Sequence, residues 1–533
     1  MGKGKIGWQI RASVSNDTMP RNRFLGMSVP GKLWFLRWAL ACGVLAMAPA
    51  RAQRAAPVEI RVDWKRAAQV NRTTITLQVV ANPRLRRGST AQASAWKSLR
   101  DLNASYARLA LWYPYPRMGV AELSEPAAAE TSWDFSAMDP LIEDFFSAVG
   151  TRPAVLCVCT VPQWMFAGTN APAVPEDPDA AVWNYEQGTA LRDDSLREVA
   201  DYYERVARWY IKGGFNDERG VRHWSGHHYR PAFWEVFNEP EYEHNFSAEQ
   251  YTRLYDAIVS RLRRVDRHLK FTGASLAIPD KGEAFFEYFL DRRHHSAGNP
   301  VDAISYHFYA LGKKDQPVET QASEFFAQAD HFLETVHKID AIRQRLSPTT
   351  QTQINETGCI AAGDQGEGPE KMSGGNIPAS YWQLCAATFA YVAGNLARAG
   401  IEVVGASQLM GHPGQFPSVS LLDWTTGLPN PRYHALKLLI DNLAPGDRLV
   451  DRDVQTPDLY ALPLLSRAGE RKILLVNKTS RDVQVQFGSD TVRRESHVDM
   501  SATGTQLRDN LSTKAVVLRP FAVMVAHVRP TSP

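Results

Sequence analysis

The sequence has few cysteines, little net charge and no long apolar run, and each shortage excludes a class of protein. Five cysteines among 533 residues are too few and too irregularly spaced for a disulfide framework or a Cys/His zinc module. Lys and Arg number 60 against 57 Asp and Glu, so charge gives no support for nucleic acid as a partner. No apolar run reaches the roughly 20 residues of a membrane span. With 44% apolar and 10% aromatic residues, the chain is predicted to be large and folded.

The first fifty or so residues differ from the rest and are predicted to be a signal peptide. Two basic residues precede an uncharged run from Trp38 to Ala48, which ends near Ala50-Arg51-Ala52, a small-x-small cleavage pattern. We therefore expect residues 1–52 to be removed and the protein to be secreted or periplasmic, with no membrane span in the mature chain. A short membrane anchor is the alternative. The mature chain would hold 52 basic and 56 acidic residues, which again does not favour a polyanion as partner.

Residues 71–445 are predicted to form a (β/α)8 barrel, an α/β fold. Short apolar strands alternate there with longer amphipathic helices, a pattern typical of parallel βαβ units. Eight strands are expected, which is the number in such a barrel. Their ranges are Thr73–Val80, Tyr106–Trp112, Pro153–Val161, Phe233–Asn238, Lys270–Leu276, Ala303–Tyr309, Thr352–Glu356 and Glu402–Leu409.

The segment from Phe166 to His228 is longer than a strand-to-helix connection needs. Its second half, near Leu196 to Ile211, is predicted to be a helix, and its first half is a candidate loop over the barrel, rich in aromatic residues such as Trp183. Those aromatic rings have two interpretations, stacking on sugar rings or packing into a small core of the loop itself.

After residue 445 the pattern changes to short apolar or alternating strands separated by turn residues. Residues 446–533 are therefore predicted to form a small accessory all-β sandwich. A further strand, within residues 53–70, is a candidate to join its sheet. The expected strands are Val58–Val62, Leu459–Leu465, Lys472–Val476, Val483–Phe487 and Val516–Val528.

Two glutamates are the candidate catalytic residues. Glu239, in Asn238-Glu239-Pro240, follows the fourth predicted strand, and Glu356 ends the seventh. The carboxyl ends of barrel strands form the active face, and strands four and seven lie on roughly opposite sides, so the two side chains can converge there. A pair of carboxyl groups about 5 to 5.5 Å apart is what retaining cleavage of a glycosidic bond requires, one as general acid/base and one as nucleophile.

Four more residues on the same face support this interpretation. Arg108 is a charge inside an apolar strand, which is costly unless a carboxylate such as Glu356 pairs with it. Asn238 is a candidate to bind the sugar hydroxyl next to the reacting carbon. His307 and Tyr309, two apart on the sixth strand, share one face. They are candidates to tune the acid/base and to donate to the nucleophile, although His307 taken alone is nearly as well explained as a core histidine.

These residues resemble clan A of the retaining glycoside hydrolases, and most closely family 39, which includes β-xylosidases and α-L-iduronidases. The likeness extends to Trp133-Asp134-Phe135-Ser136, Thr151-Arg152-Pro153, Ser418–Asp423 and Pro431–Leu436, and it covers about residues 71–445. The β-module also looks like the accessory sandwich of that family. The resemblance implies Glu239 as acid/base, Glu356 as nucleophile, and a donor-sugar subsite lined by Arg108, Asn238, His307 and Tyr309. We expect a carbohydrate substrate and neither metal nor cofactor.

The sequence departs from the family pattern at the eighth strand. Many clan members place a tryptophan there, under the bound sugar, whereas this chain has Ser407-Gln408-Leu409. Gln408 is a candidate to hydrogen-bond sugar hydroxyls instead. The long segment after the third strand has no counterpart that we can match, so the substrate does not follow from the resemblance.

Three other functions remain open at this stage. A different clan A activity, such as a β-glucosidase, β-glucuronidase or endo-acting glycanase, would use the same two glutamates with different loops. A non-catalytic polysaccharide-binding or cell-envelope protein on a degenerate barrel is the main alternative, and the presence of both glutamates speaks against it. A metal-dependent hydrolase would need ligands beyond the clustered His223, His227 and His228, and no H-E-x-x-H pattern joins them.

Overall fold

The structure is a computed structural model that describes residues 56–530, apart from short stretches at 128–129, 169–171, 186–187, 314–315, 363, 365–376, 413–414, 454–455 and 502–503. The predicted signal peptide lies outside the described residues. Among the helices of the described part, none is long and apolar enough to cross a membrane.

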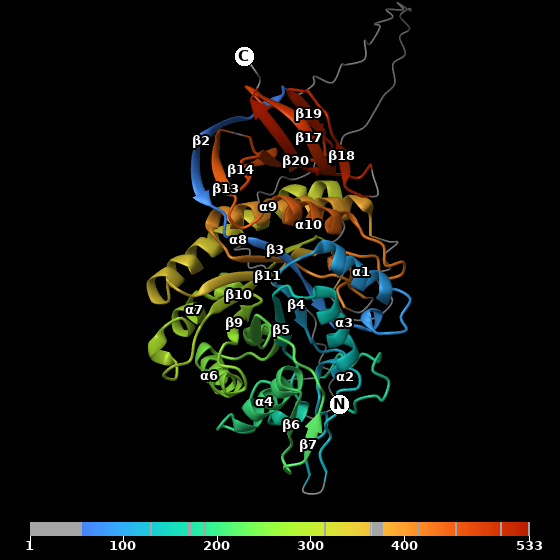
Figure 1. Ribbon diagram of the computed structural model, residues 1–533, viewed down its shortest axis with the longest axis vertical. Coiled ribbons are helices and arrows are strands. Elements are labelled where there is room, and N and C mark those ends of the chain that lie inside the picture. Colours follow the sequence, from blue (N-terminus) through green and yellow to red (C-terminus); the bar gives the residue numbers. More distant parts are fainter. Residues whose placement is uncertain are drawn as a thin grey trace, which may run out of the picture. The chain divides into compact units, whose positions relative to one another are not determined.

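Eight parallel strands form a closed barrel, and they follow one another around it in chain order (Figure 1). Each predicted barrel strand has one counterpart, which confirms the (β/α)8 fold. Most of these strands are buried on both faces, as expected where helices cover a parallel sheet. Their bounds are β3 (Thr74–Val80), β4 (Ala107–Ala110), β5 (Ala154–Val158), β8 (Phe233–Val236), β9 (Lys270–Leu276), β10 (Ala303–Leu311), β11 (Gln351–Ile360) and β12 (Val403–Ala406).

Helices follow the strands along the chain and bury their apolar faces in the main core. The helix expected near Leu196 to Ile211 is present as α4, and two short strands, β6 (Gly214–Asn216) and β7 (Arg222–Trp224), follow it as a hairpin. The helices are α1 (Gln92–Leu102), α2 (Pro116–Gly119), α3 (Asp139–Val149), α4 (Arg197–Lys212), α5 (Pro240–Glu243), α6 (Ala248–Val265), α7 (Glu283–Phe289), α8 (Val318–Leu346), α9 (Ala379–Ala399) and α10 (Pro431–Asn442).

Strand β11 is longer than predicted, and Glu356 lies inside it rather than at its end. The strand runs on to Ile360 and stays paired with β10. The register shifts near Glu356 in both pairings of the strand. In the pairing with β10 the shift lies between Ser305 and His307, and in the pairing with β12 it lies between Ile354 and Thr357. Thr357 and Gly358, which lie beyond the predicted end of the strand, are still paired with β10. A register shift changes the direction of nearby side chains, which is common beside functional sites.

The C-terminal region forms two β-sheets with a shared apolar core that includes Ile60, Leu475, Val485 and Met524. The larger sheet has the order β18-β17-β20-β15-β14-β13-β2 and the smaller one β1-β16-β19. Chain from before the barrel contributes to both, since β1 pairs with β16 and β2 with β13. The strands are β1 (Val58–Glu59), β2 (Arg61–Val70), β13 (Arg448–Asp453), β14 (Leu459–Leu465), β15 (Arg471–Asn477), β16 (Val483–Gln486), β17 (Asp490–Val498), β18 (Gln506–Arg508), β19 (Ala515–Leu518) and β20 (Val523–Pro530).

The prediction of one strand from Val516 to Val528 is wrong. The strand is interrupted between Leu518 and Val523, where Pro520 has no N–H to donate to a neighbouring strand and Phe521 has a positive φ of 55°. The chain itself continues. It therefore passes from the smaller sheet, as β19, to the larger one, as β20.

The larger sheet contacts the barrel helices through α9. Gln383 Nε2 on that helix donates to the carbonyl oxygens of Val498 and Phe521, at 3.1 and 2.7 Å. Gly394 faces the Tyr460 ring of β14, and a Cβ atom at this position would lie 2.6 Å from the Tyr460 hydroxyl. The glycine thus permits close contact between helix and sheet, and the sandwich supports the barrel on this side.

Candidate active site

Arg108, on β4, is the centre of the polar cluster inside the barrel. Its neighbours Ala107 and Leu109 pack in the apolar core, so the alternation of the strand turns Arg108 the other way. The guanidinium is buried and donates from Nε to Glu235, from Nη1 to Glu356 Oε1 at 2.7 Å, and from Nη2 to Asn238 Oδ1 at 2.7 Å. Side chains from opposite strands of the barrel thus meet on one cation.

Glu235 is a second carboxylate bound to Arg108, and it is completely buried. Its Oε1 atom accepts hydrogen bonds from Ser275 Oγ at 2.6 Å, Asn355 Nδ2 at 2.7 Å and Ser305 Oγ at 3.0 Å. A buried carboxylate is stable when its charge and lone pairs are satisfied in this way. Glu235 therefore holds the floor of the site in place and has no exposure to a substrate.

Glu239 follows β8 and immediately precedes α5, as its N-cap residue. Its backbone is left-handed, with φ of 42° and ψ of 49°, a conformation that a non-glycine residue adopts at some cost and that is frequent at functional sites. Its side chain is 18% exposed, and its Oε1 atom lies 2.7 Å from His307 Nδ1. Among the charged groups at the centre of the site, Glu239 is the one most open to a ligand.

Glu356 is held by donors on both oxygens. Arg108 donates to Oε1, and the Tyr309 hydroxyl donates to Oε2 at 2.6 Å. The Tyr309 oxygen also lies 2.7 Å from Ser407 Oγ. Burial alone would raise the pKa of Glu356, but the charges of His307 and Arg108 and the Tyr309 hydrogen bond together lower it below its ordinary value. The carboxylate is therefore ionised in the free protein.

Both ring nitrogens of His307 are hydrogen-bonded. Ser275 has one hydroxyl proton and donates it to Glu235, so the Ser275 oxygen accepts from His307 Nε2 at 3.2 Å. Nδ1 faces Glu239 at 2.7 Å and Glu356 at 3.6 Å. Burial would lower the pKa of His307, but the charge of Glu356 and the hydrogen bond to Glu239 raise it. His307 and Glu239 thus share one proton across the short contact between Nδ1 and Oε1.

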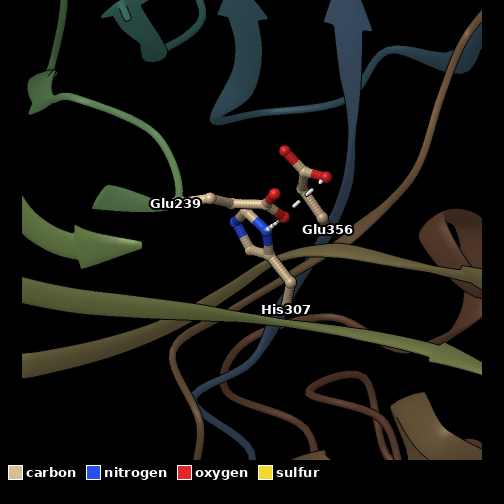
Figure 2. A group of neighbouring side chains, drawn as sticks. All are labelled: Glu239, His307 and Glu356. Carbon is tan, nitrogen blue, oxygen red and sulfur yellow. Dashed lines mark hydrogen bonds and ion pairs between the residues drawn. The ribbon is translucent and has the colours of Figure 1, made fainter. Parts of the chain in front are cut away.

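Figure 2 shows the side chains of Glu239, His307 and Glu356 close together. Glu239 follows β8, whereas His307 lies on β10 and Glu356 on β11. One oxygen of each glutamate and one nitrogen of His307 all lie within 4.8 Å of one another. The pair combines an ionised carboxylate with a carboxyl group that shares a proton. Such a pair can perform nucleophilic attack and proton transfer at a single point.

Among the described residues, these same three side chains lie close enough together to hold a metal ion. Their contacts do not favour this, because both ring nitrogens of His307 and both oxygens of Glu356 are already hydrogen-bonded. Two of the clustered histidines that raised the possibility of a metal site pair with different acidic residues. His223 pairs with Asp217 at 2.9 Å and His227 with Asp139 at 3.4 Å.

The structure brings six of the seven proposed site residues into one network and leaves out Gln408. That side chain is buried, and its Nε2 atom donates to the carbonyl of Gln415. Its neighbour Ser407 belongs to the network instead, because its Oγ atom contacts the Tyr309 hydroxyl that donates to Glu356. Residues that the sequence analysis did not identify complete the network: Gln78, Glu235, Glu243, Ser275 and Ser407.

Arg108→Met tests the role of this cation in stability. We expect the free energy of unfolding to fall by about 3–5 kcal/mol, because two buried carboxylates lose their counter-charge. Arg87→Met is the matched control, since Arg87 also pairs with two acidic side chains but is half exposed, and it should cost less than about 1 kcal/mol. Urea denaturation measures both, and equal losses would contradict a structural role for the buried cluster.

No protein-family model matches the chain, and no curated protein matches it. Its likeness is to solved structures. A family 39 β-xylosidase from Caulobacter crescentus matches with a TM-score of 0.56 at 14% identity, over 89% of this chain and 100% of that one. A family 51 α-L-arabinofuranosidase from Bifidobacterium longum matches with 0.59 at 11% identity, over 89% and 100%. A glucosidase from Croceicoccus marinus matches with 0.56 at 14% identity, over 89% and 99%. This protein therefore has the fold of the clan A glycoside hydrolases.

Proposed function

We propose that the protein is a retaining glycoside hydrolase that cleaves O-glycosidic bonds by double displacement. The observation that carries this proposal is the pair Glu239 and Glu356, which approach within 4.8 Å from opposite sides of the barrel. Such a close approach of two carboxylate oxygens supports direct attack by one carboxylate, because the carboxyl groups of inverting enzymes lie about 6.5–9.5 Å apart to admit a water.

Glu356 is the proposed nucleophile. It is ionised and fixed in direction by Arg108 and Tyr309, as attack on an anomeric carbon requires. The two donors also stabilise the carboxylate when it leaves again in the second step.

Glu239 is the proposed acid/base. The proton for the departing oxygen lies on the hydrogen bond that Glu239 shares with His307. After the leaving group has gone, the same carboxylate takes a proton from the incoming water, and His307 remains beside it as the partner of that proton. The partial exposure of Glu239 gives both the leaving group and water access.

The substrate class is proposed as oligosaccharides, polysaccharides or glycoconjugates met outside the cytoplasm. The cleavage pattern at Ala50-Arg51-Ala52 supports export. The solved structures with this fold include enzymes named for xylosides, arabinofuranosides and glucosides, so pentosides and hexosides of both anomeric configurations are the first substrates to try.

A panel of nitrophenyl glycosides and polysaccharides, assayed with the native protein and with Glu356→Gln, tests the proposal. At least one glycoside should be hydrolysed by the native protein alone. Proton NMR of the first-formed sugar should then show the anomeric configuration of the substrate. Hydrolysis with inversion would contradict double displacement, and hydrolysis by both proteins would place the site elsewhere.

Tyr309→Phe should move the acid limb of kcat/KM to higher pH. The Tyr309 hydroxyl is one of the groups that lower the pKa of Glu356, so its loss lets that pKa rise and protonates the nucleophile at a pH where the native enzyme is still active. Phe308→Leu, a change on the same strand beside Tyr309 but outside the polar network, is the control. An unshifted acid limb in Tyr309→Phe would show that another group sets it.

A further inference from the structure

Glu243 is a carboxyl group next to the site for which the proposed mechanism has no role. It lies one helical turn after Glu239, at the end of α5. Its Oε1 atom accepts two hydrogen bonds, from Asn238 Nδ2 at 2.9 Å and from Trp112 Nε1 at 2.7 Å. Through this one oxygen the loop after β4 and the loop after β8 are joined beside the catalytic pair.

Arg108 fixes which way round the Asn238 amide stands. A guanidinium only donates hydrogen bonds, so the atom 2.7 Å from Arg108 Nη2 must be the oxygen Oδ1. The amide nitrogen then faces Glu243. Nδ2 has two hydrogens, and Glu243 takes one of them. The direction of the other is set by the same plane.

The buried position of Glu243 favours its neutral form. Asn238 and Trp112 both donate to Oε1, whereas Oε2 is buried and has no hydrogen-bond partner among the residues that the structure describes. An ionised carboxylate in that position would leave a buried charge unsatisfied. Burial, followed by the charge of Glu239 and the nearby Cys159, raises the pKa of Glu243 well above its ordinary value, against the hydrogen bonds from Asn238 and Trp112. None of these four neighbours is a cation.

We infer that Glu243, as a neutral acid, is a positioning residue that orients Asn238 toward the sugar hydroxyl next to the reacting carbon. The inference rests on the proposed function and adds to it a requirement for a free hydroxyl at that carbon. Such a contact strengthens in the transition state, so its loss should appear in kcat more than in KM. Trp112, held by the same oxygen, packs against the rings of Trp183 and Phe416 at centroid distances of 6.0 and 6.3 Å, which keeps Glu243 in place.

The test combines two variants with two substrates, the best nitrophenyl glycoside from the panel and its 2-deoxy analogue. Glu243→Gln keeps an accepting oxygen and a neutral charge, and kcat/KM should stay within about threefold of native. Glu243→Met keeps the length of the side chain but cannot accept, and kcat on the parent glycoside should fall about 10- to 100-fold, the range seen when a group that orients a functional side chain is removed. On the 2-deoxy analogue the Met variant should lose less than about threefold, since the contact it disturbs is already absent.

Glu241→Met is the matched control, because Glu241 lies on the same turn and accepts from the Ile278 N–H rather than from Asn238. Its effect should be the same on both substrates. Equal losses in Glu243→Met on both substrates would reduce Glu243 to a purely structural role and overturn the inference. So would a Glu243→Gln variant with less than one-tenth of native kcat/KM, a result that decides even if the Met variant does not fold. A native protein that hydrolyses no glycoside would instead refute the proposed function.

Discussion

Glu356→Ala should lower kcat by about 10⁴-fold or more for every leaving group, because the variant has no group to attack the anomeric carbon. The loss should not depend on the acidity of the leaving alcohol, since the first bond-making step itself is removed. Added azide fits the space of the deleted carboxylate and can attack in its place. With an activated substrate it should restore turnover and give a glycosyl azide of inverted anomeric configuration, as a single displacement requires.

Glu235→Ala provides the comparison for this experiment. Glu235 also binds Arg108 but is fully buried on the floor of the site, so its loss should reduce stability and give no azide product. If azide instead rescued Glu235→Ala, or if Glu356→Ala kept more than about one-hundredth of native kcat, the nucleophile would have been assigned to the wrong residue.

Glu239→Ala should show a different dependence on the leaving group. The attacking carboxylate is intact, so substrates with good leaving groups should still form the glycosyl-enzyme, while substrates that need protonation should react about 10²- to 10⁴-fold more slowly. Breakdown of the intermediate then limits turnover because no base activates water. Azide needs no base, so it should accelerate turnover and give a glycosyl azide with the configuration of the substrate, after two inversions.

Steady-state kinetics over a series of aryl glycosides, with NMR of the azide product, distinguishes these outcomes. His307→Gln is a useful companion, since it removes the group that shares a proton with Glu239 but leaves the carboxylate. An inverted azide from Glu239→Ala together with a retained one from Glu356→Ala would mean that the two roles are exchanged.

The barrel could be predicted because its apolar strands and amphipathic helices each have a local sequence pattern. Parallel strands covered by helices are apolar on both faces, and runs such as Lys270–Leu276 stand out from the amphipathic helices between them. The sandwich was harder to predict. Strands β13 and β17 carry several charged residues, Arg448 and Asp451 in one, Arg493 and Glu495 in the other, and their pairing comes from long-range contacts that leave little periodicity in the sequence.

The two glutamates and Arg108 could be named as candidates because a charged residue at the end of, or within, an apolar strand is costly unless it is paired or functional. Glu235 sends the same signal, between Trp234 and Val236, and was overlooked beside the more obvious Glu239. Gln78 and Ser407 are different, since a neutral polar residue in a strand is unremarkable until its partners are known. Gln408 was named as a candidate and Ser407 was not, because the sequence does not show which of two adjacent side chains faces the barrel interior.

Glu356 is proposed to form a covalent bond with the sugar. An activated 2-deoxy-2-fluoro glycoside of the sugar found in the panel tests it most directly, since the fluorine slows both steps through the oxocarbenium-like transition state and the good leaving group restores the first. Intact-mass analysis should show one added fluoroglycosyl group per chain, and peptide sequencing should place it on Glu356. A label on any other residue, or a native enzyme that hydrolyses the parent glycoside yet never becomes labelled, would contradict the assignment of Glu356 as nucleophile.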